Sequence, residues 1–289
     1  MSFAFRIVNV FTVDGDRLSG NPLCVFEDAR GLTDAQMQAL ARQMNLSETT
    51  FVLPATAERG QGADARVRIF TPGFEMPFAG HPTLGTASIV AGARGATQVT
   101  LEMKAGLVPV VSDGGRWTLR AARAPVTREV EATCAELAAM VGLPADAIGE
   151  RPLWVDTGVE QLVIPVTSAE HVRAARPDPA LLERHGMCPG RGEAMAYLWA
   201  RGAGASDEWT VRFLFTLDGS VVEDPATGSA CANLGGWMIA TGQPLPVRAS
   251  LRQGDAVQRP SRLGLRVEAD GGVYVSGEVM ELGRGTITL

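Results

Sequence analysis

The chain has 289 residues, of which 46% are hydrophobic and 20% charged, and its net charge at pH 7 is −6. This length is sufficient for a large core and for two domains. The acidic balance and the lack of a basic run argue against nucleic acid as a partner, and no stretch reaches the ~20 apolar residues of a membrane span. Because no charged leader precedes an apolar segment, we expect a cytoplasmic protein with no membrane partner.

The first half of the sequence predicts mostly strands, together with two helices. Apolar residues at helical spacing, preceded by Thr33 as N-cap, predict a helix over 32–45. A second helix is predicted over 82–93. The other apolar stretches are typical of strands, and the last of them forms a hairpin around a Gly-Gly turn; they cover residues 3–12, 20–28, 47–55, 66–72 and 97–122.

The second half begins after a proline-containing joint near residues 123–126. Three helices are predicted here, over 133–144, 177–186 and 225–240. A strand pair is predicted over 152–166, a single strand over 209–215 and a β-rich tail over 262–289. Strands and helices do not alternate regularly along the chain, which favours an α+β fold over a doubly wound sheet.

Two segments of the sequence resemble each other without a gap, 143 residues apart: His81-Pro82-Thr83-Leu84-Gly85-Thr86-Ala87 and Asp224-Pro225-Ala226-Thr227-Gly228-Ser229-Ala230. A repeat at about half the chain length predicts two lobes of similar structure, related by a pseudo-twofold axis, because a solenoid repeats every ~20–50 residues.

Each copy of this repeat has an apolar strand, then a titratable side chain, then a proline at the expected first helical position. Small residues follow and leave the N–H groups of the helix start available to an anion. Two such junctions, one carrying His81 and the other Asp224, predict a cleft for a small anionic ligand. The alternative is a duplicated helix start that serves packing alone.

Metal and cofactor signatures are missing from the sequence. The four cysteines show neither C-x-x-C spacing nor clustering with histidine, so we expect no metal site. Lys104 is the only lysine, and its surroundings offer nothing else for pyridoxal phosphate. No nucleotide-binding glycine motif occurs. We therefore expect no cofactor.

Six segments, in order over nearly the whole chain, resemble the phenazine-biosynthesis isomerase (PhzF-like) family: GNPLCVF, ARQMNLSETTFVLP, RIFTPGFEMPFAGHPTLGTA, VVEDPATGSA, RPS and GRGTITL. The joint occurrence of SET, GHP and EDPATGS is specific, whereas each motif alone is weak. The resemblance implies a diaminopimelate-epimerase-like α+β fold with two pseudo-symmetric lobes, each a β-sheet or barrel wrapped around a central helix. The expected lobes are 1–122 with about 278–289, and 123–277, with the active-site cleft between them. The resemblance also implies a homodimer and no cofactor.

The chemistry that the resemblance implies is the isomerisation of trans-2,3-dihydro-3-hydroxyanthranilate, a small anionic cyclic substrate, by movement of a proton from C3. Glu48 of SET matches the carboxylate that carries the proton in the family. The other residues that match the family's site are His81 and Asp224, expected to take part in catalysis, and Ser47, Gly80, Gly228 and Ser229, expected to bind substrate.

Each of these residues also has a purely structural interpretation. Glu48 would be a solvated charge at a strand start, and His81 a satisfied core histidine. Ser47 would bond backbone, Asp224 would be a helix N-cap, and Ser229 would be a small packing residue. The combination of motifs favours the catalytic interpretation over the five separate ones.

The sequence argues against a two-thiol epimerase but does not identify the substrate. A two-thiol epimerase needs a cysteine from each lobe, and the 143-residue offset places Ser88 opposite Cys231. The segment FLFTLDGSVVED lacks the turn expected before the second motif in the phenazine enzyme. Three hypotheses follow: isomerisation of the dihydro-hydroxyanthranilate, isomerisation or epimerisation of an unrelated small metabolite, and binding of a small acid without turnover.

Overall fold

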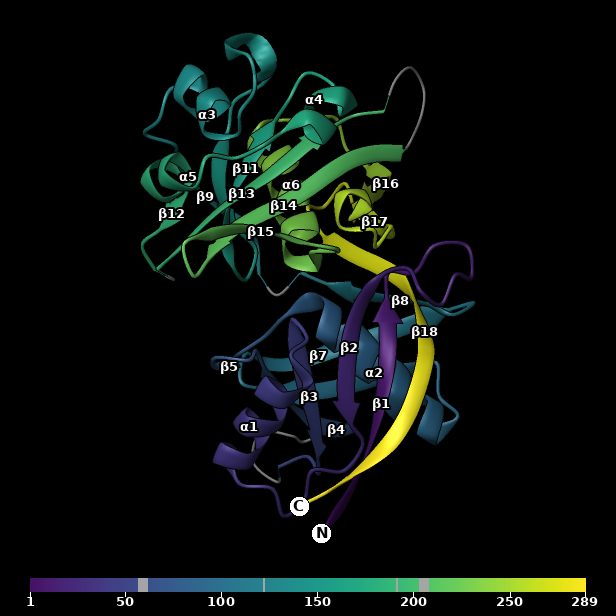
Figure 1. Ribbon diagram of the computed structural model, residues 1–289. Helices are drawn as coiled ribbons and strands as arrows, with labels where there is room; N and C mark the ends of the chain where they lie inside the picture. Colours follow the sequence, from purple (N-terminus) through teal and green to yellow (C-terminus); the bar gives the residue numbers. More distant parts are fainter. Residues whose placement is uncertain (57–61, 122, 191, 203–207) are drawn as a thin grey trace. The chain divides into compact units, whose positions relative to one another are not determined.

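The computed structural model describes residues 1–56, 62–121, 123–190, 192–202 and 208–289 (Figure 1). Internal contacts divide the chain into two units, Met1–Arg120 with Ser276–Leu289, and Ala121–Val275. We call them the N lobe and the C lobe. The predicted boundary at residue 122 lies outside the described residues. No helix in the described part of the chain is long and apolar enough to cross a membrane.

The N lobe is a closed ring of strands in the order β1–β2–β3–β4–β6–β7–β8–β18. The β2–β3 and β4–β6 pairs are parallel, and β18 closes the ring by pairing with both β1 and β8. The short β5 forms a hairpin with β4. The strands are β1 (Ser2–Val10), β2 (Asn21–Phe26), β3 (Glu48–Leu53), β4 (Ala65–Phe70), β5 (Glu75–Met76), β6 (Gln98–Met103), β7 (Gly106–Asp113), β8 (Arg116–Arg120) and β18 (Val273–Thr288).

Helix α2 (Gly80–Arg94) is the central helix of the N lobe and contacts β1, β2, β3, β4, β6 and β8 (Figure 1). Its residues from Gly80 to Ala87 are all buried, as expected of a helix surrounded by a barrel. A Cβ atom on Gly85 would lie 2.5 Å from Leu23 Cδ2, so only glycine allows the helix to approach β2 this closely. The helix begins two residues before the predicted start, and Pro82 is therefore its third residue rather than its first.

Helix α1 (Asp34–Met44) of the N lobe confirms the predicted start signal. Thr33 is the N-cap, and its side chain and that of Gln36 exchange hydrogen bonds with each other's backbone in a capping box. The apolar face of the helix packs on a cluster of aromatic side chains in which Phe26 stacks on Phe51 and Phe51 meets Phe70 edge-on.

The C lobe repeats the pattern of parallel and antiparallel pairs with the strand order β9–β10–β11–β13–β14–β16–β17. The β11–β13 and β14–β16 pairs are parallel, at positions that correspond to the two parallel pairs of the N lobe. Its strands are β9 (Val126–Glu129), β10 (Leu153–Asp156), β11 (Glu160–Pro165), β12 (Met187–Cys188), β13 (Glu193–Ala200), β14 (Glu208–Leu217), β15 (Ser220–Asp224), β16 (Val247–Gln253) and β17 (Ser261–Val267).

Helix α6 (Gly228–Ala240) is the central helix of the C lobe and contacts β9, β10, β11 and β17 (Figure 1). Gly235 allows close packing here, since its Cβ would lie 2.8 Å from a methyl group of Val273. The smaller helices are α3 (Cys134–Met140), α4 (Ala169–Ala174) and α5 (Pro179–His185), with the 3-10 turns η1 (Ala145–Ala147) and η2 (Asp255–Val257). The sequence patterns predict α3 and α5 but miss α4, and they also miss β13 and β16.

The strand registers correct the predicted repeat. Ile69 of β4 faces Met76 of β5, and Phe213 of β14 faces Asp224 of β15. The central helix then begins four residues after Met76 in one lobe and four residues after Asp224 in the other. The segment EMPFAGH therefore corresponds to EDPATGS, with an offset of 148 residues from Met76 to Asp224 rather than 143. Pro-x-x-Gly occurs twice in tandem in the N lobe, and the offset of 143 residues is wrong because it matches the second of these two motifs.

An Arg–Glu pair conserved between the lobes supports the corrected offset. Arg68 binds Glu75 across the β4–β5 hairpin at 2.7 Å, and Arg212 binds Glu223 across the β14–β15 hairpin at 2.7 Å. Arg212 also donates to the Ala175 carbonyl at the end of α4. In each lobe, an equivalent Arg–Glu ion pair thus joins the two strands of the hairpin that precedes the central helix.

Candidate active site

In the N lobe, the structure brings two predicted catalytic residues into contact. Glu48 is the first residue of β3 and faces Leu23 on the parallel strand β2. His81 is the second residue of α2. The side chains meet with 3.2 Å between His81 Nδ1 and Glu48 Oε2, although the residues are far apart in sequence. Their side chains are 5% and 16% exposed, respectively, so Glu48 is not a solvated charge.

The environment of His81 keeps its imidazole neutral. Burial lowers the pKa of His81 to about 4, and the backbone of Pro22 opposes this shift only in part. The Pro22 carbonyl accepts a hydrogen bond from the ring, and the approach of Nδ1 to Glu48 Oε2 at 3.2 Å is a close contact without a hydrogen bond. The other ring nitrogen, Nε2, is buried and makes no hydrogen bond to the described residues. The interpretation of His81 as a fully satisfied core histidine is therefore not supported.

A hydrogen bond between two hydroxyl groups joins β3 to α2 close to Glu48 and His81. The Thr50 and Thr86 hydroxyls are 2.8 Å apart, and both side chains are buried. Ser47 makes a long hydrogen bond of 3.5 Å to the Asn21 side chain. Gly80 is the first residue of α2 and is buried beside His81. Thr50, Thr86 and Asn21 were not predicted, because nothing in a strand or helix pattern distinguishes these polar residues from others.

In the C lobe, Asp224 is the last residue of β15 and is not the N-cap of α6. That position belongs to Thr227, so the N-cap interpretation of Asp224 is wrong. The Thr227 hydroxyl instead donates to Asp224 Oδ2 at 2.5 Å. The buried side chain of Gln253 donates to the Asp224 carbonyl at 2.8 Å. Gln253 was missed, although it follows Ala249 and Leu251 on the inward face of an alternating strand.

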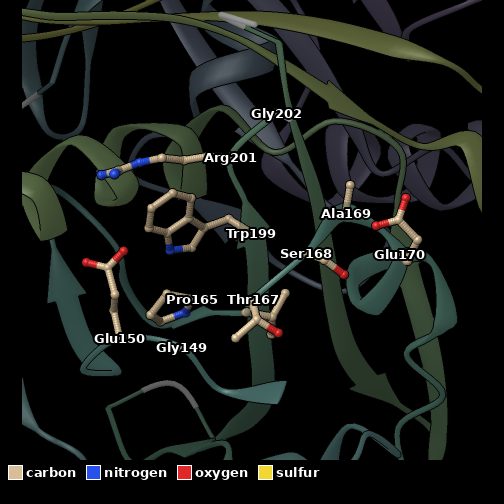
Figure 2. Close-up of a pocket in the computed structure, with 11 residues that line it drawn as sticks. Gly149, Glu150, Pro165, Thr167, Ser168, Ala169, Glu170, Trp199, Arg201 and Gly202 are labelled. Carbon is tan, nitrogen blue, oxygen red and sulfur yellow. The ribbon is translucent and has the colours of Figure 1, made fainter. Parts of the chain in front are cut away.

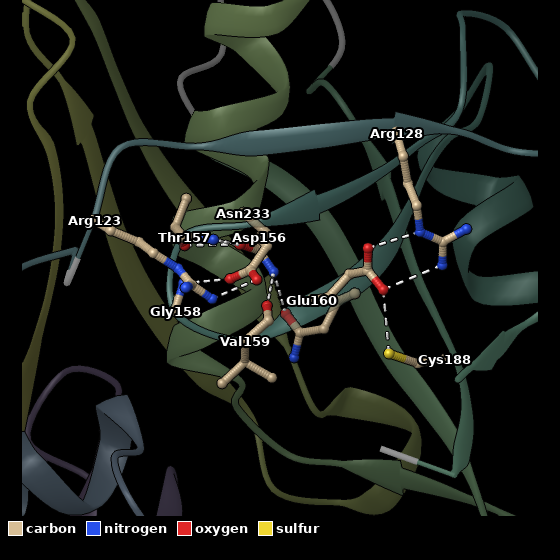
Figure 3. A network of polar contacts seen from close by, with 10 residues as sticks. Arg123, Arg128, Asp156, Thr157, Gly158, Val159, Glu160, Cys188 and Asn233 are labelled. Atoms are coloured by element: carbon tan, nitrogen blue, oxygen red, sulfur yellow. Dashed lines mark hydrogen bonds and ion pairs between the residues drawn. The ribbon is translucent and has the colours of Figure 1, made fainter. Parts of the chain in front are cut away.

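Gly228 and Ser229 are the first two residues of α6, and Ser229 occupies the place that His81 has in α2. Gln161 Nε2 donates to Ser229 Oγ at 3.0 Å, and Gln161 accepts from Asn233 one turn further along the helix. Figure 3 shows Asn233 bonded to Thr157 on the loop between β10 and β11. Ser229 thus belongs to a buried polar network and does more than fill space.

Cys231 has the properties of a packing residue. It is fully buried, and burial raises the pKa of its thiol, which disfavours the reactive thiolate. With the corrected offset it corresponds to Thr83 rather than Ser88, and neither is a thiol.

Glu48 of the N lobe corresponds to Met195 of the C lobe. Glu48 lies three residues before the residue that faces Arg68 in the β3–β4 pair, and Met195 lies three residues before the residue that faces Arg212 in the β13–β14 pair. Among the described residues, no group of histidine, cysteine and acidic side chains is arranged to hold a metal ion.

A cavity of about 450 Å³ lies in the C lobe (Figure 2). Its lining includes Glu150, Trp199 and Arg201. Gln243, which follows α6, binds both Glu150 and Arg201, so the cavity lies near the C-terminal end of α6. The predicted residues Asp224, Gly228 and Ser229 are at the opposite end of that helix and do not line the cavity.

Known proteins resemble the chain over its whole length. An uncharacterized isomerase of Pasteurella multocida is 36% identical over 99% of this chain and 94% of its own. The trans-2,3-dihydro-3-hydroxyanthranilate isomerase of Pseudomonas aeruginosa is 35% identical over 94% of this chain and 95% of its own. The crystal structure of a PhzF-family protein from Bacillus anthracis matches with a TM-score of 0.84 at 22% identity, covering 100% of both chains.

The fold extends to epimerases. A probable proline racemase from Agrobacterium radiobacter matches with a TM-score of 0.63 at 15% identity, over 99% of this chain and 93% of its own. Together with the closed barrel around α2 in the N lobe and the sheet that packs on α6 in the C lobe, this confirms the predicted epimerase-like α+β fold. The family model described as phenazine biosynthesis-like protein matches residues 8–284. The chain therefore belongs to the phenazine biosynthesis-like (PhzF) family of isomerases.

Proposed function

We propose that the protein is a cofactor-independent isomerase in which Glu48 moves a proton on a small cyclic amino or hydroxy acid. The observation that carries the proposal is the contact between Glu48 and the buried, neutral His81. A carboxylate that is mostly shielded from water and touches a group able to exchange a proton suits general acid–base catalysis. The absence of a second acid at the corresponding position, Met195, favours one residue that acts first as base and then as acid.

The proposed reaction balances without an added reagent. The Glu48 carboxylate takes the proton from C3 of trans-2,3-dihydro-3-hydroxyanthranilate, the electrons shift through the ring, and the proton is returned at another ring position. The resulting enol relaxes to the ketone, so product and substrate have the same atoms and oxidation level. The developing negative charge needs nearby donors. Our proposal assigns this role to His81 and to the start of α2 at Gly80.

We further propose that Asp224, Gly228 and Ser229 bind the same substrate as Glu48 and His81. Asp224 would hold the amino group of the substrate, since a carboxylate is the natural acceptor for an ammonium or amine donor. The N–H groups at the start of α6 favour an anionic group. The 35% sequence identity to the anthranilate isomerase of Pseudomonas aeruginosa makes the dihydro-hydroxyanthranilate the first substrate to test.

A second candidate is isomerisation of a different small metabolite. The uncharacterized isomerase of Pasteurella multocida, at 36% identity, is as similar to the chain as the anthranilate isomerase is. Binding without turnover is a third candidate, which the Glu48–His81 contact argues against, because a binding protein needs no proton-transferring pair.

One experiment separates these candidates. Purified protein is tested for binding of the stable product-like acid 3-hydroxyanthranilate by thermal shift, and for turnover of the dihydro compound by absorbance. Binding with turnover that depends on Glu48 supports the proposal. Turnover that is equally fast in Glu48→Gln contradicts the role of Glu48. Binding without any turnover contradicts the proposed substrate and favours the other two candidates.

A further inference from the structure

The connector between β15 and α6 is held by one buried side chain from a distant strand. Gln253, the last residue of β16, is 1% exposed. Its Nε2 donates to the Asp224 carbonyl at 2.8 Å and to Thr227 Oγ1 at 3.0 Å. Its Oε1 accepts from the Thr227 N–H at 3.2 Å. Gln253 therefore binds both ends of the connector from Asp224 to Thr227.

The donor and acceptor of each of these hydrogen bonds are determined, and the last donor in the series points at the Asp224 carboxylate. The backbone N–H of Thr227 can only donate, which places the Gln253 carbonyl oxygen against it and the amide nitrogen against the Asp224 carbonyl. Since Thr227 Oγ1 accepts from Gln253, its own proton is available for Asp224 Oδ2, at 2.5 Å. A donor aimed at a carboxylate favours its charged form and restricts its rotation.

The segment after Gln253 packs its backbone directly on the connector. Gly254 has φ +81°, and a Cβ atom on it would lie 2.6 Å from the Pro225 carbonyl oxygen. The Arg259 N–H returns to the Gly254 carbonyl at 3.0 Å and closes the loop that leads to Ser261. The RPS motif, residues 259–261, thus belongs to the segment that supports the connector.

The N lobe has apolar residues at all three corresponding positions. Asp224 corresponds to Met76, and Thr227 to Ala79, by the corrected offset. Leu251 of β16 pairs with β14 in the way that Leu101 of β6 pairs with β4. Gln253 and Met103 each lie two residues after these leucines and therefore correspond to each other. The N lobe forms the same strand hairpin and central helix with Met76, Ala79 and Met103. The polar set in the C lobe is therefore not needed for the fold.

We infer that Gln253 and Thr227 are positioning residues, which hold the Asp224 carboxylate in the orientation that the reaction requires. The inference rests on the proposed function, in which Asp224 contacts the substrate. Its structural part, the dependence of the connector on Gln253, is tested without any substrate.

The test without substrate uses the residues of the N lobe as replacements. Hydrogen exchange is measured for the Thr227 amide in the wild type, in Gln253→Met and in the matched control Gln243→Leu, whose side chain holds the other end of α6. We expect exchange at Thr227 to become at least about tenfold faster in Gln253→Met, because its acceptor is lost, and to be unchanged in the control. Unchanged exchange in Gln253→Met overturns the inference. If Gln253→Met does not fold, Thr227→Ala serves, with the amide exchange of residues 226–229 as the readout.

The test with substrate asks whether both residues act through Asp224. We expect Thr227→Ala and Gln253→Met each to lower kcat about tenfold with little change in KM, and Thr227→Ser to restore most of the loss. In the Asp224→Asn background, Thr227→Ala should cause no further loss. Additive losses in that background overturn the inference. A wild type that does not turn over the dihydro compound refutes the proposed function instead, and the exchange measurement then decides the inference alone.

Discussion

The two strand-to-helix junctions have one backbone plan and two different sets of side chains. In the N lobe, the corresponding positions hold the apolar residues Met76, Ala79 and Met103, and His81, two residues after Ala79, contacts Glu48. In the C lobe, the connector itself carries the acidic group, Asp224, and Ser229 occupies the place of His81. The comparison teaches that the duplicated fold conserves the hairpin and the helix start, while the chemistry differs at each equivalent position.

The largest expected effect is on turnover when the N-lobe carboxylate is neutralised. We expect Glu48→Gln to lower kcat about 1,000-fold while ligand binding persists, because the amide keeps the shape but cannot accept and return a proton. Steady-state kinetics and thermal shift measure the two quantities. The control is Glu27→Gln, in the same lobe but paired with Arg6, which should retain activity. A loss of only a few-fold in Glu48→Gln would show that another group moves the proton.

The next effect concerns the partner of Glu48. We expect His81→Ala to lower kcat about 100-fold and to weaken ligand binding, since the variant removes the imidazole that contacts Glu48. Circular dichroism checks that the variant is folded. A variant with normal kinetics per folded molecule and a much lower Tm would instead make His81 a core residue only.

The central helices provide a comparison in stability. A methyl group on Gly85 would meet Leu23 and Val10 at 2.5 and 2.9 Å, whereas nothing lies within 4 Å of the same group on Gly92 of the same helix. We expect Gly85→Ala to lower the free energy of unfolding by about 1–3 kcal/mol and Gly92→Ala to raise it by up to about 1 kcal/mol. Denaturant unfolding measures both. Equal effects of the two substitutions would contradict the packing described for α2.

The pH dependence of stability follows from the buried imidazole. The pKa of His81 is about 4 in the folded state and 6.5 in its ordinary state. Between these values the unfolded chain binds a proton that the folded chain does not, so stability falls as the pH drops from 6.5 to 4 and is unaffected above 6.5. The contribution amounts to about 3 kcal/mol over this window. His81→Asn should remove that part of the wild-type pH dependence, measured by unfolding at pH 7 and pH 4.5. Parallel pH profiles for the two proteins would contradict it.

The smallest expected effect is that of the buried thiol of Cys231. We expect Cys231→Ala to change kcat less than about twofold, because a buried, protonated thiol is inert. A loss as large as that of Glu48→Gln would revive a thiol mechanism.

Local sequence signals predicted the parts of the fold that depend on local interactions. Thr33 and the apolar positions of α1 specify a helix start and a buried face by themselves. The contact of Glu48 with His81 depends on how β3 packs on α2, which no spacing within either segment reveals; the family motifs supplied those residues instead. The repeat was found but misplaced by five residues, because tandem Pro-x-x-Gly motifs match equally well in sequence and only strand register distinguishes them. Strand β13 was missed because an apolar run such as EAMAYLWA fits a buried strand and a helix alike.

The central claim, that Glu48 carries the proton, is tested most directly by following hydrogen in the product. The dihydro compound is incubated with enzyme in D₂O, and the product is examined by NMR. We predict that the wild type releases the C3 hydrogen and delivers hydrogen or deuterium to the new ring position, and that Glu48→Gln, with ligand bound, leaves C3 intact. Release of the C3 hydrogen at the wild-type rate by Glu48→Gln would contradict the account.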